Sequence, residues 1–168
     1  MDNFRQRAVT LPELLSVVAL LALMNTYALP SFSQWVTKNE QQSLQESLLH
    51  HLRTARSKAV LQERTLEICA STDGLRCIGE WNKGWILRVA KTEEVLAVEQ
   101  LSLKDSALHW HGYRERILFR RDGQTPLSNG RFYLCHGNKV AWQLIISRQG
   151  LARRGSDKEN QAAAYRCI

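Results

Sequence analysis

One apolar run near the start of the chain, residues 8–30, constrains the fold more than any other feature. The run carries a single acid, Glu13, and Arg5 and Arg7 precede it. About 20 predominantly apolar residues are enough to cross a bilayer as a helix, and residues 9–29 reach that length. Because a carboxylate inside such a helix is costly, Glu13 is expected to have a function of its own.

The spacing inside this run resembles the N-terminus of type IV prepilins. That family carries Gly-Phe-Thr-Leu-x-Glu in front of an apolar helix, and the corresponding residues here are Ala8-Val9-Thr10-Leu11-Pro12-Glu13. Ala8 and Val9 stand where the family has Gly and Phe. The resemblance implies that a prepilin peptidase cleaves between Ala8 and Val9 and that Val9 is then N-methylated. It also makes Glu13 and Pro30 the fifth and twenty-second residues of the mature chain.

The same resemblance implies roles for Glu13 and Pro30 in filament assembly. In pilin filaments the carboxylate at the fifth position meets a positively charged N-terminal amine, either of its own chain or of a neighbour. An unpaired charge inside an apolar helix bundle is strongly unfavourable, so this pair is expected to set the register of the subunits. Pro30 is expected to kink the helix.

Three other interpretations of the apolar run remain open. A secretory signal peptide needs an A-x-A-like cleavage site, which residues 28–30 supply poorly, and it has no use for Glu13. An uncleaved signal anchor needs only the length of the run. A buried core helix is disfavoured because residues 14–24 offer no polar face.

Hydrophobic periodicity predicts one long helix from about Pro12 to Gln62. Beyond Pro30, apolar residues recur at spacings of three and four, which is typical of a helix with one apolar face. Beyond Arg64 the period shifts toward two and the residues become strand formers. The expected strands are 65–70, 85–90, 95–103, 108–113, 116–119, 132–135, 140–146 and 151–153.

This order of elements predicts an α+β fold, in which a long N-terminal pilin helix packs against an antiparallel β-sheet head. The first half of the helix is hydrophobic and the second half is amphipathic. Four parts are expected: a leader peptide at 1–8, a transmembrane or filament-core helix at 9–30, an amphipathic helix at 31–62 and a β-rich periplasmic head at 63–168.

Four cysteines, Cys69, Cys77, Cys135 and Cys167, form an even set. In a chain that leaves the cytoplasm they are expected to form disulfides, and the sequence alone allows three pairings. We favour Cys69–Cys77, which brackets a short loop rich in turn residues, and Cys135–Cys167, which would tie down the C-terminus. A zinc site is the alternative, but no Cys-x2-Cys spacing supports it.

Motifs in the first half of the head are similar to those of the GspH/FimT family of minor pilins and minor pseudopilins. They are Ala-Arg-Ser-Lys-Ala-Val at 55–60, Cys-x-Ser-x-Asp-Gly-x-x-Cys at 69–77 and Trp-x-x-Gly-Trp at 81–85. The resemblance implies a minor type IV pilin, a structural subunit in the initiation, assembly or tip of the pilus. The alternative is a minor pseudopilin of a type II secretion system with a purely structural role at the tip.

The resemblance also implies where the protein resides and what it contacts. The precursor is expected to be a single-pass protein of the inner membrane with its head in the periplasm, and the mature subunit is expected in the pilus at the cell surface. The implied partners are other major and minor pilins, the prepilin peptidase and the assembly platform of the inner membrane.

The whole net charge of +7 comes from the last third of the chain. Residues 1–111 carry 12 basic and 12 acidic residues, whereas residues 112–168 carry 11 basic and 4 acidic residues. Nine of these eleven basic residues are arginines, which match the geometry of phosphate groups well. The candidate DNA-binding residues are Arg148, Arg153, Arg154 and Lys158.

Some FimT-type minor pilins bind DNA for natural transformation, and in them the resemblance points to a C-terminal Gly-Arg-x-Arg motif. The corresponding residues here are Gly150-Leu151-Ala152-Arg153-Arg154-Gly155, so Leu151 replaces the first arginine. Double-stranded DNA is therefore a candidate partner, and its binding would weaken steeply with salt. The alternatives are a solvated basic face and arginines that pair with neighbouring subunits.

The sequence predicts no enzyme. His109 and His111 lie two positions apart, and therefore on one face of an expected strand, but no Asp, Glu or Cys stands at a ligand spacing beside them. No known catalytic or phosphate-binding motif occurs. We therefore expect no catalytic residue, no metal site and no cofactor.

Overall fold

The computed structural model describes residues 10–167, except for the side chains of residues 23–31. The chain divides into two compact units, Met1–Glu40 and Gln41–Ile168. The described part of the first unit is helical, and the second unit contains the eight strands found in the described part of the chain.

Helix α1 spans Leu11–Leu61 and agrees with the expected helix to within one residue at each end. At its start, the carbonyl oxygen of Thr10 accepts hydrogen bonds from the backbone N–H groups of Glu13 (3.0 Å) and Leu14 (3.1 Å). Glu13 therefore lies in the first turn, where a carboxylate also interacts favourably with the positive end of the helix dipole.

The first unit exposes a row of large apolar side chains along α1. At least half of the surface of each is accessible: Leu11, Leu14, Leu15, Val17, Val18, Leu20 and Leu21. Among the described residues, no helix is long and apolar enough to cross a membrane. The transmembrane segment expected at 9–30 is therefore not confirmed. The kink at Pro30 stays a prediction, because that side chain lies outside the described ones.

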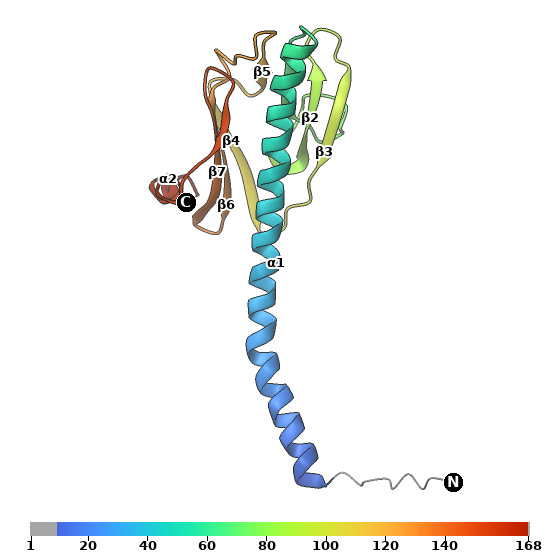
Figure 1. Cartoon of the computed structure of the whole chain (residues 1–168), viewed down its shortest axis with the longest axis vertical. Coiled ribbons are helices and arrows are strands. Elements are labelled where there is room, and N and C mark those ends of the chain that lie inside the picture. Colours follow the sequence, from blue (N-terminus) through green and yellow to red (C-terminus); the bar gives the residue numbers. More distant parts are fainter. Residues whose placement is uncertain (1–9, 168) are drawn as a thin grey trace, which may run out of the picture. The chain divides into compact units, whose positions relative to one another are not determined.

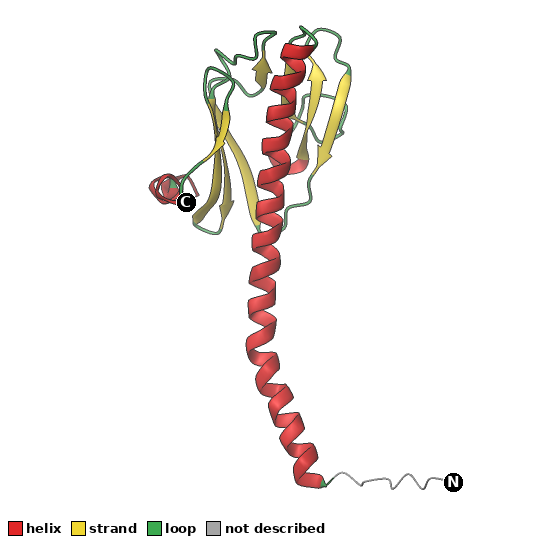
Figure 2. Ribbon diagram, in the orientation of Figure 1, coloured by secondary structure: helices red, strands yellow, loops and turns green. Residues whose placement is uncertain are grey.

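The antiparallel head consists of two four-stranded sheets, with strand orders β3-β2-β1-β5 and β4-β6-β7-β8. All expected strands are present, with ends that differ by up to three residues. The first sheet contains β1 Leu66–Ala70, β2 Gly84–Val89, β3 Val95–Gln100 and β5 Ile117–Phe119. The second contains β4 Ser106–Gly112, β6 Gly130–His136, β7 Lys139–Ile146 and β8 Ala152–Arg154. Figure 2 shows the strands in yellow.

Both sheets pack against the C-terminal half of α1, with β2 and β3 on one side and β4, β6 and β7 on the other (Figure 1). The helix contributes apolar residues at spacings of three and four: Leu44, Leu48, Leu49, Leu52, Ala55 and Ala59. Trp85, Phe119 and Phe132 of the strands are fully buried against this face. The indole N–H of Trp142 donates a hydrogen bond to the carbonyl oxygen of Gln41, at 2.8 Å. The alternating strand pattern predicted by the sequence thus places one face of each sheet in a shared core.

The outer face of each sheet carries a segment anchored by a disulfide. The loop 71–79 lies over the first sheet and is tied to it by Cys69–Cys77. Helix α2 (Asp157–Ala162) and the 3-10 turn η2 (Ala164–Cys167) lie over the second sheet, where Cys135–Cys167 anchors the end. The two disulfides are the pairing that the spacing favours. The sequence did not predict α2, η2 or η1, a 3-10 turn at Trp81–Lys83.

Candidate functional site

The candidate DNA-binding residues lie at the edge of the second sheet. Arg148 follows β7, Arg153 and Arg154 lie on β8, and Lys158 lies on α2. The turn between β7 and β8 requires Gly150, which has φ +76° and leaves no room for a Cβ beside a neighbouring carbonyl oxygen. This tight turn pairs β8 with β7 and so fixes which way each arginine points.

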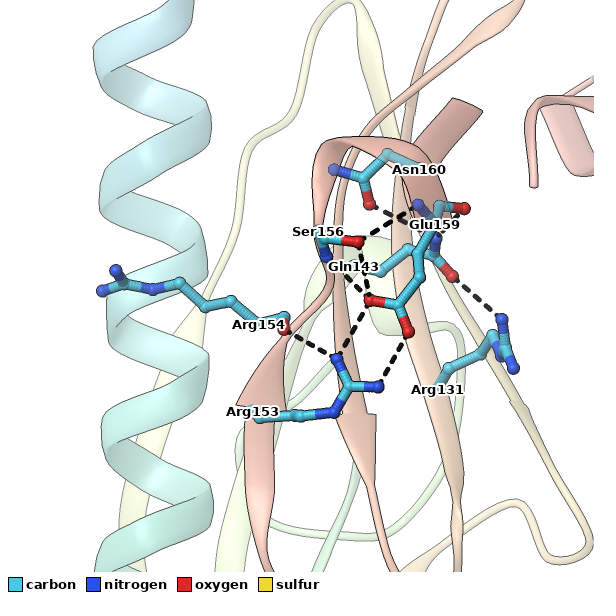
Figure 3. Close-up of polar contacts among 7 residues, drawn as sticks. All are labelled: Arg131, Gln143, Arg153, Arg154, Ser156, Glu159 and Asn160. Atoms are coloured by element: carbon cyan, nitrogen blue, oxygen red, sulfur yellow. Dashed lines mark hydrogen bonds and ion pairs between the residues drawn. The ribbon is translucent and has the colours of Figure 1, made fainter. Parts of the chain in front are cut away.

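Arg153 lies opposite Ile145 on the outer face and forms an ion pair with Glu159 of α2 (Figure 3). Its Nη2 lies 2.7 Å from Oε1 of Glu159, and its Nη1 lies 3.0 Å from Oε2. These bonds from Arg153, and then the backbone N–H of Ser156, lower the pKa of Glu159 to about 2. The same contact raises the pKa of Arg153. This bidentate geometry holds a guanidinium in one orientation.

Arg154 is the next residue of the strand and points the opposite way, toward α1 (Figure 3). Its guanidinium contacts the carboxylate of Glu46, and both side chains are about half exposed. The carbonyl oxygen of Arg154 also accepts a hydrogen bond from Nη1 of Arg153, at 3.2 Å. The two neighbouring arginines therefore do not present one common cationic surface.

A polar network attaches α2 to the second sheet. The side chain of Gln143 is fully buried, and its amide donates to the carbonyl oxygen of Glu159 (2.9 Å) and to Oδ1 of Asn160 (3.3 Å). Its own Oε1 accepts from Arg131, at 3.3 Å. Ser156 and Glu159 form a reciprocal capping box at the start of the helix. Arg153 is thus part of the structure that holds the C-terminal segment in place.

Arg148 and Lys158 are exposed, and within the described part of the chain neither side chain forms an ion pair. Of the four candidate cations, two are therefore compensated by carboxylates and two are available to an external anion. A phosphate that approached Arg153 or Arg154 would have to compete with Glu159 or Glu46.

A buried ion pair on the first sheet was not predicted from the sequence. Nε of Arg88 lies 2.6 Å from the carboxylate of Glu67, and both side chains are more than nine-tenths buried. Arg116 approaches the same carboxylate at 3.4 Å, and Glu93 lies 3.2 Å from Arg88. Because each buried charge has an opposite partner, the pair is tolerated beneath the disulfide loop.

One group in the described part of the chain has donor atoms close enough for a metal ion: Glu67, Cys69 and Cys77. The two cysteines are joined in a disulfide, so they offer no thiolate ligand. His109 stacks on the ring of Tyr133, with centroids 5.1 Å apart, and His111 is exposed on the same strand. Neither histidine belongs to such a group among the described residues.

The residues expected to act in processing and assembly lie at the other end of the chain. Ala8 and Val9 fall outside the described residues, as does the side chain of Pro30. Glu13 is exposed in the first turn of α1, and its carbonyl oxygen accepts a hydrogen bond from the Ser16 hydroxyl, at 2.8 Å.

Sequence reasoning missed Glu159 and Glu46, the partners of the two arginines. For Glu159 a signal was present, because Ser156-Asp157-Lys158-Glu159 matches the capping-box pattern of a helix start. Glu46 is separated from Arg154 by 108 positions. No local pattern indicates a contact across such a distance.

Comparison with known proteins assigns the chain to a family. The family described as type II transport protein GspH matches residues 44–150, which is more than half of the chain. The chain therefore belongs to the GspH family. No curated protein sequence matches it.

Crystal structures of a type IV minor pilin share the fold. The type IV minor pilin FimU of Pseudomonas aeruginosa is similar over 74% of this chain and 94% of that chain, with 24% identity and a TM-score of 0.58. A second crystal form of FimU matches over 70% and 94%, with 24% identity and a TM-score of 0.54. The minor pseudopilin EpsH from the type 2 secretion system of Vibrio cholerae has 8% identity and a TM-score of 0.45, over 66% of this chain and 92% of that one.

Proposed function

We propose that the chain is a minor type IV pilin, a structural subunit that takes part in the initiation or assembly of the pilus or lies at its tip. The observation that carries this proposal is the row of exposed apolar side chains between Leu11 and Leu21. A continuous apolar surface of this kind marks a site that other helices or lipid cover. Membership of the GspH family supports a role as a subunit.

In this proposal the chain matures as prepilins do. Residues 9–30 hold the precursor in the inner membrane with the head in the periplasm, and the prepilin peptidase cleaves between Ala8 and Val9. Val9 is then methylated, and Glu13 pairs with an N-terminal amine as the assembly platform adds the subunit to other major and minor pilins. The apolar row enters the helix bundle, and the head faces outward at the cell surface.

A single substitution tests the role of Glu13. Glu13→Ala should reduce the amount of the subunit in sheared pili by more than about tenfold, because an unpaired amine in an apolar bundle costs about 3–5 kcal/mol. Immunoblotting of sheared pili and of whole cells measures incorporation and total protein separately. Glu40→Ala, which removes an exposed acid from the same helix, is the matched control and should leave incorporation unchanged. Wild-type incorporation of the Glu13 variant would refute the mechanism.

The alternative is a minor pseudopilin with a purely structural role at the tip of a type II secretion system. The two systems can be separated by deleting the chain from its own host. Loss of surface pili with normal protein secretion supports the pilus, whereas loss of secretion with normal pili supports the secretion system.

A second candidate function is the binding of double-stranded DNA for uptake. The observation that favours it is the uncompensated charge of residues 112–168, together with the exposed and unpaired side chains of Arg148 and Lys158. The ion pairs described above change which residues are expected to contact DNA phosphates. Arg153 and Arg154 already have carboxylate partners, so Arg148 and Lys158 are expected to make the stronger phosphate contacts.

Fluorescence anisotropy with a labelled short duplex, at about 50 and about 200 mM salt, tests this order. Arg148→Ala with Lys158→Ala should lower the affinity and reduce the salt slope by about 2, one for each lost phosphate contact. Arg153→Ala with Arg154→Ala is the matched control, because it removes the same formal charge and should have the smaller effect. The absence of binding by the wild-type chain at low salt would exclude this function.

A further inference from the structure

We propose that a groove on the head binds an extended peptide segment of a partner protein, with a lysine or arginine of that segment between two carboxylates of the groove. The groove lies between the disulfide loop, η1 and strand β4, and we call it the β4 groove. The residues that carry the argument are Glu80, Trp81, Asn82, Leu108, Trp110 and Glu115. The proposal concerns the head alone and depends neither on Glu13 nor on the C-terminal arginines.

The β4 groove has the size of a binding site. Its volume is about 530 Å³, within the range of about 300–1,000 Å³ that is usual for ligand sites. The disulfide Cys69–Cys77 forms part of its wall, and the rings of Trp81 and Trp110 form another part, with centroids 6.5 Å apart. Phe132 packs against both indoles and keeps them in place. The wall is therefore covalently and sterically fixed before any ligand arrives.

Beyond Leu108, strand β4 offers an unpaired edge to the groove. β4 is the end strand of its sheet, and it pairs with β6 along only one of its two edges. The backbone N–H of Leu108 points away from β6, because it donates to Oδ1 of Asn82. Backbone groups of a strand alternate in direction, so those of Trp110, two residues on, point the same way. Outside the β4–β6 ladder, no described residue forms a backbone hydrogen bond with Trp110. Such an edge is a template for the addition of another strand.

The charges in the groove select the chemistry of the added segment. Glu80 and Glu115 both line the groove, both are exposed, and neither carboxylate has a hydrogen-bond or ion-pair partner among the described residues. Arg116, the basic residue in the same wall, approaches the carboxylate of Glu67. On a chain with a net charge of +7, two unpaired carboxylates in one groove favour a cation and disfavour an anion such as nucleic acid.

Trp81 can report on occupancy of the groove. It lines the groove and is only 9% exposed, and its ring lies beside that of Trp110. The exposed part of the Trp110 ring would also attract a basic side chain through its π face.

Titration of the full-length chain in detergent micelles with a short synthetic peptide tests the proposal. The probe alternates valine and threonine around a central lysine, and its control carries glutamate in place of the lysine. Binding of the lysine peptide, with a dissociation constant of about 1 mM or lower, should shift the indole N–H resonance of Trp81 in the NMR spectrum. It should also slow hydrogen exchange at the amide of Trp110, because an added strand accepts from that group.

Glu80→Gln with Glu115→Gln should weaken the binding of the lysine peptide by about tenfold or more. The matched control, Glu40→Gln with Glu94→Gln, removes two exposed acids outside the groove and should leave the affinity unchanged. Equal binding of the glutamate peptide, or no shift of the Trp81 indole at millimolar peptide, would overturn the proposal. Neither readout depends on filament assembly, so failure here is distinguishable from failure of the proposed function.

Discussion

The two sheets of the head bury different polar groups beneath their outer covers. Each packs its inner face on α1 and carries a disulfide-anchored cover on its outer face. Beneath the loop 71–79, the first sheet buries a charged pair, Glu67 and Arg88. Beneath α2, the second sheet buries a neutral amide, Gln143, and leaves its ion pairs at the surface.

This difference predicts that the two covers contribute unequally to stability. A buried charge that loses its partner is costly, because neither water nor a counter-ion can reach it. An amide that loses a hydrogen bond costs less, and an exposed ion pair contributes little because water and salt screen it. The first sheet is therefore expected to be the stronger determinant of folding.

The largest expected effect comes from breaking the buried pair. Glu67→Ala should lower the free energy of unfolding by about 3–5 kcal/mol, because it leaves Arg88 buried beside only the exposed Glu93. Gln143→Ala, the corresponding change in the second sheet, should cost about 1–3 kcal/mol. Guanidinium denaturation followed by tryptophan fluorescence measures both. Glu94→Ala removes an exposed acid and should change stability by less than about 0.5 kcal/mol. A smaller loss for Glu67→Ala than for Gln143→Ala would invert the comparison.

The disulfides allow a second test. Here the second sheet is expected to show the larger loss of stability. Cys135–Cys167 closes a separation of 32 residues and Cys69–Cys77 closes one of 8. Loop-closure entropy predicts losses of about 3.7 and about 2.5 kcal/mol when each pair is replaced by serine. Thermal unfolding of the two double variants compares them. If the Cys69–Cys77 variant were the less stable, the wall of the β4 groove would matter more than chain entropy.

The smallest expected effect concerns pH. Each cover contains one carboxylate with a lowered pKa: Asp73 in the loop and Glu159 in α2. The backbone N–H groups of Arg76 and Leu75 lower the pKa of Asp73, and Arg153 lowers that of Glu159 to about 2. Both groups are therefore ionised at neutral pH.

A carboxylate with a depressed pKa in the folded state stabilises that state above its unfolded pKa. The contribution of Glu159 is thus complete above about pH 4.5 and is lost as the pH falls toward about 2. The contribution of Asp73 is likewise present above its unfolded pKa and is lost as the pH falls below it, because the pKa of Asp73 is lowered in the folded state. Hydrogen exchange of the two covers, measured as the pH falls from about 4.5 toward about 2, tests both contributions. Arg153→Ala should move the loosening of α2 to higher pH, and an unchanged profile would contradict the assigned cause.

Much of the secondary structure and part of the site follow from local patterns. The period of apolar residues predicts α1 and all eight strands, because burial of one face imposes a repeat of 3.6 or 2 residues. Spacing and turn residues also favour the disulfide pairing that is present, because Cys69 and Cys77 bracket a short loop. The short helix α2 was missed, because its apolar face is too small to produce a period. Only the capping box of Ser156 and Glu159 marks it.

The opening segment and the charge distribution show how far a sequence alone determines this protein. Residues 8–30 predict an apolar helix around Glu13, and composition shows that residues 112–168 hold the excess charge. Only the tertiary structure decides which of these charges are free. Arg154 meets Glu46 across 108 positions because α1 and β8 pack together. Contacts of this kind depend on where elements lie in space, and local patterns carry no information about that.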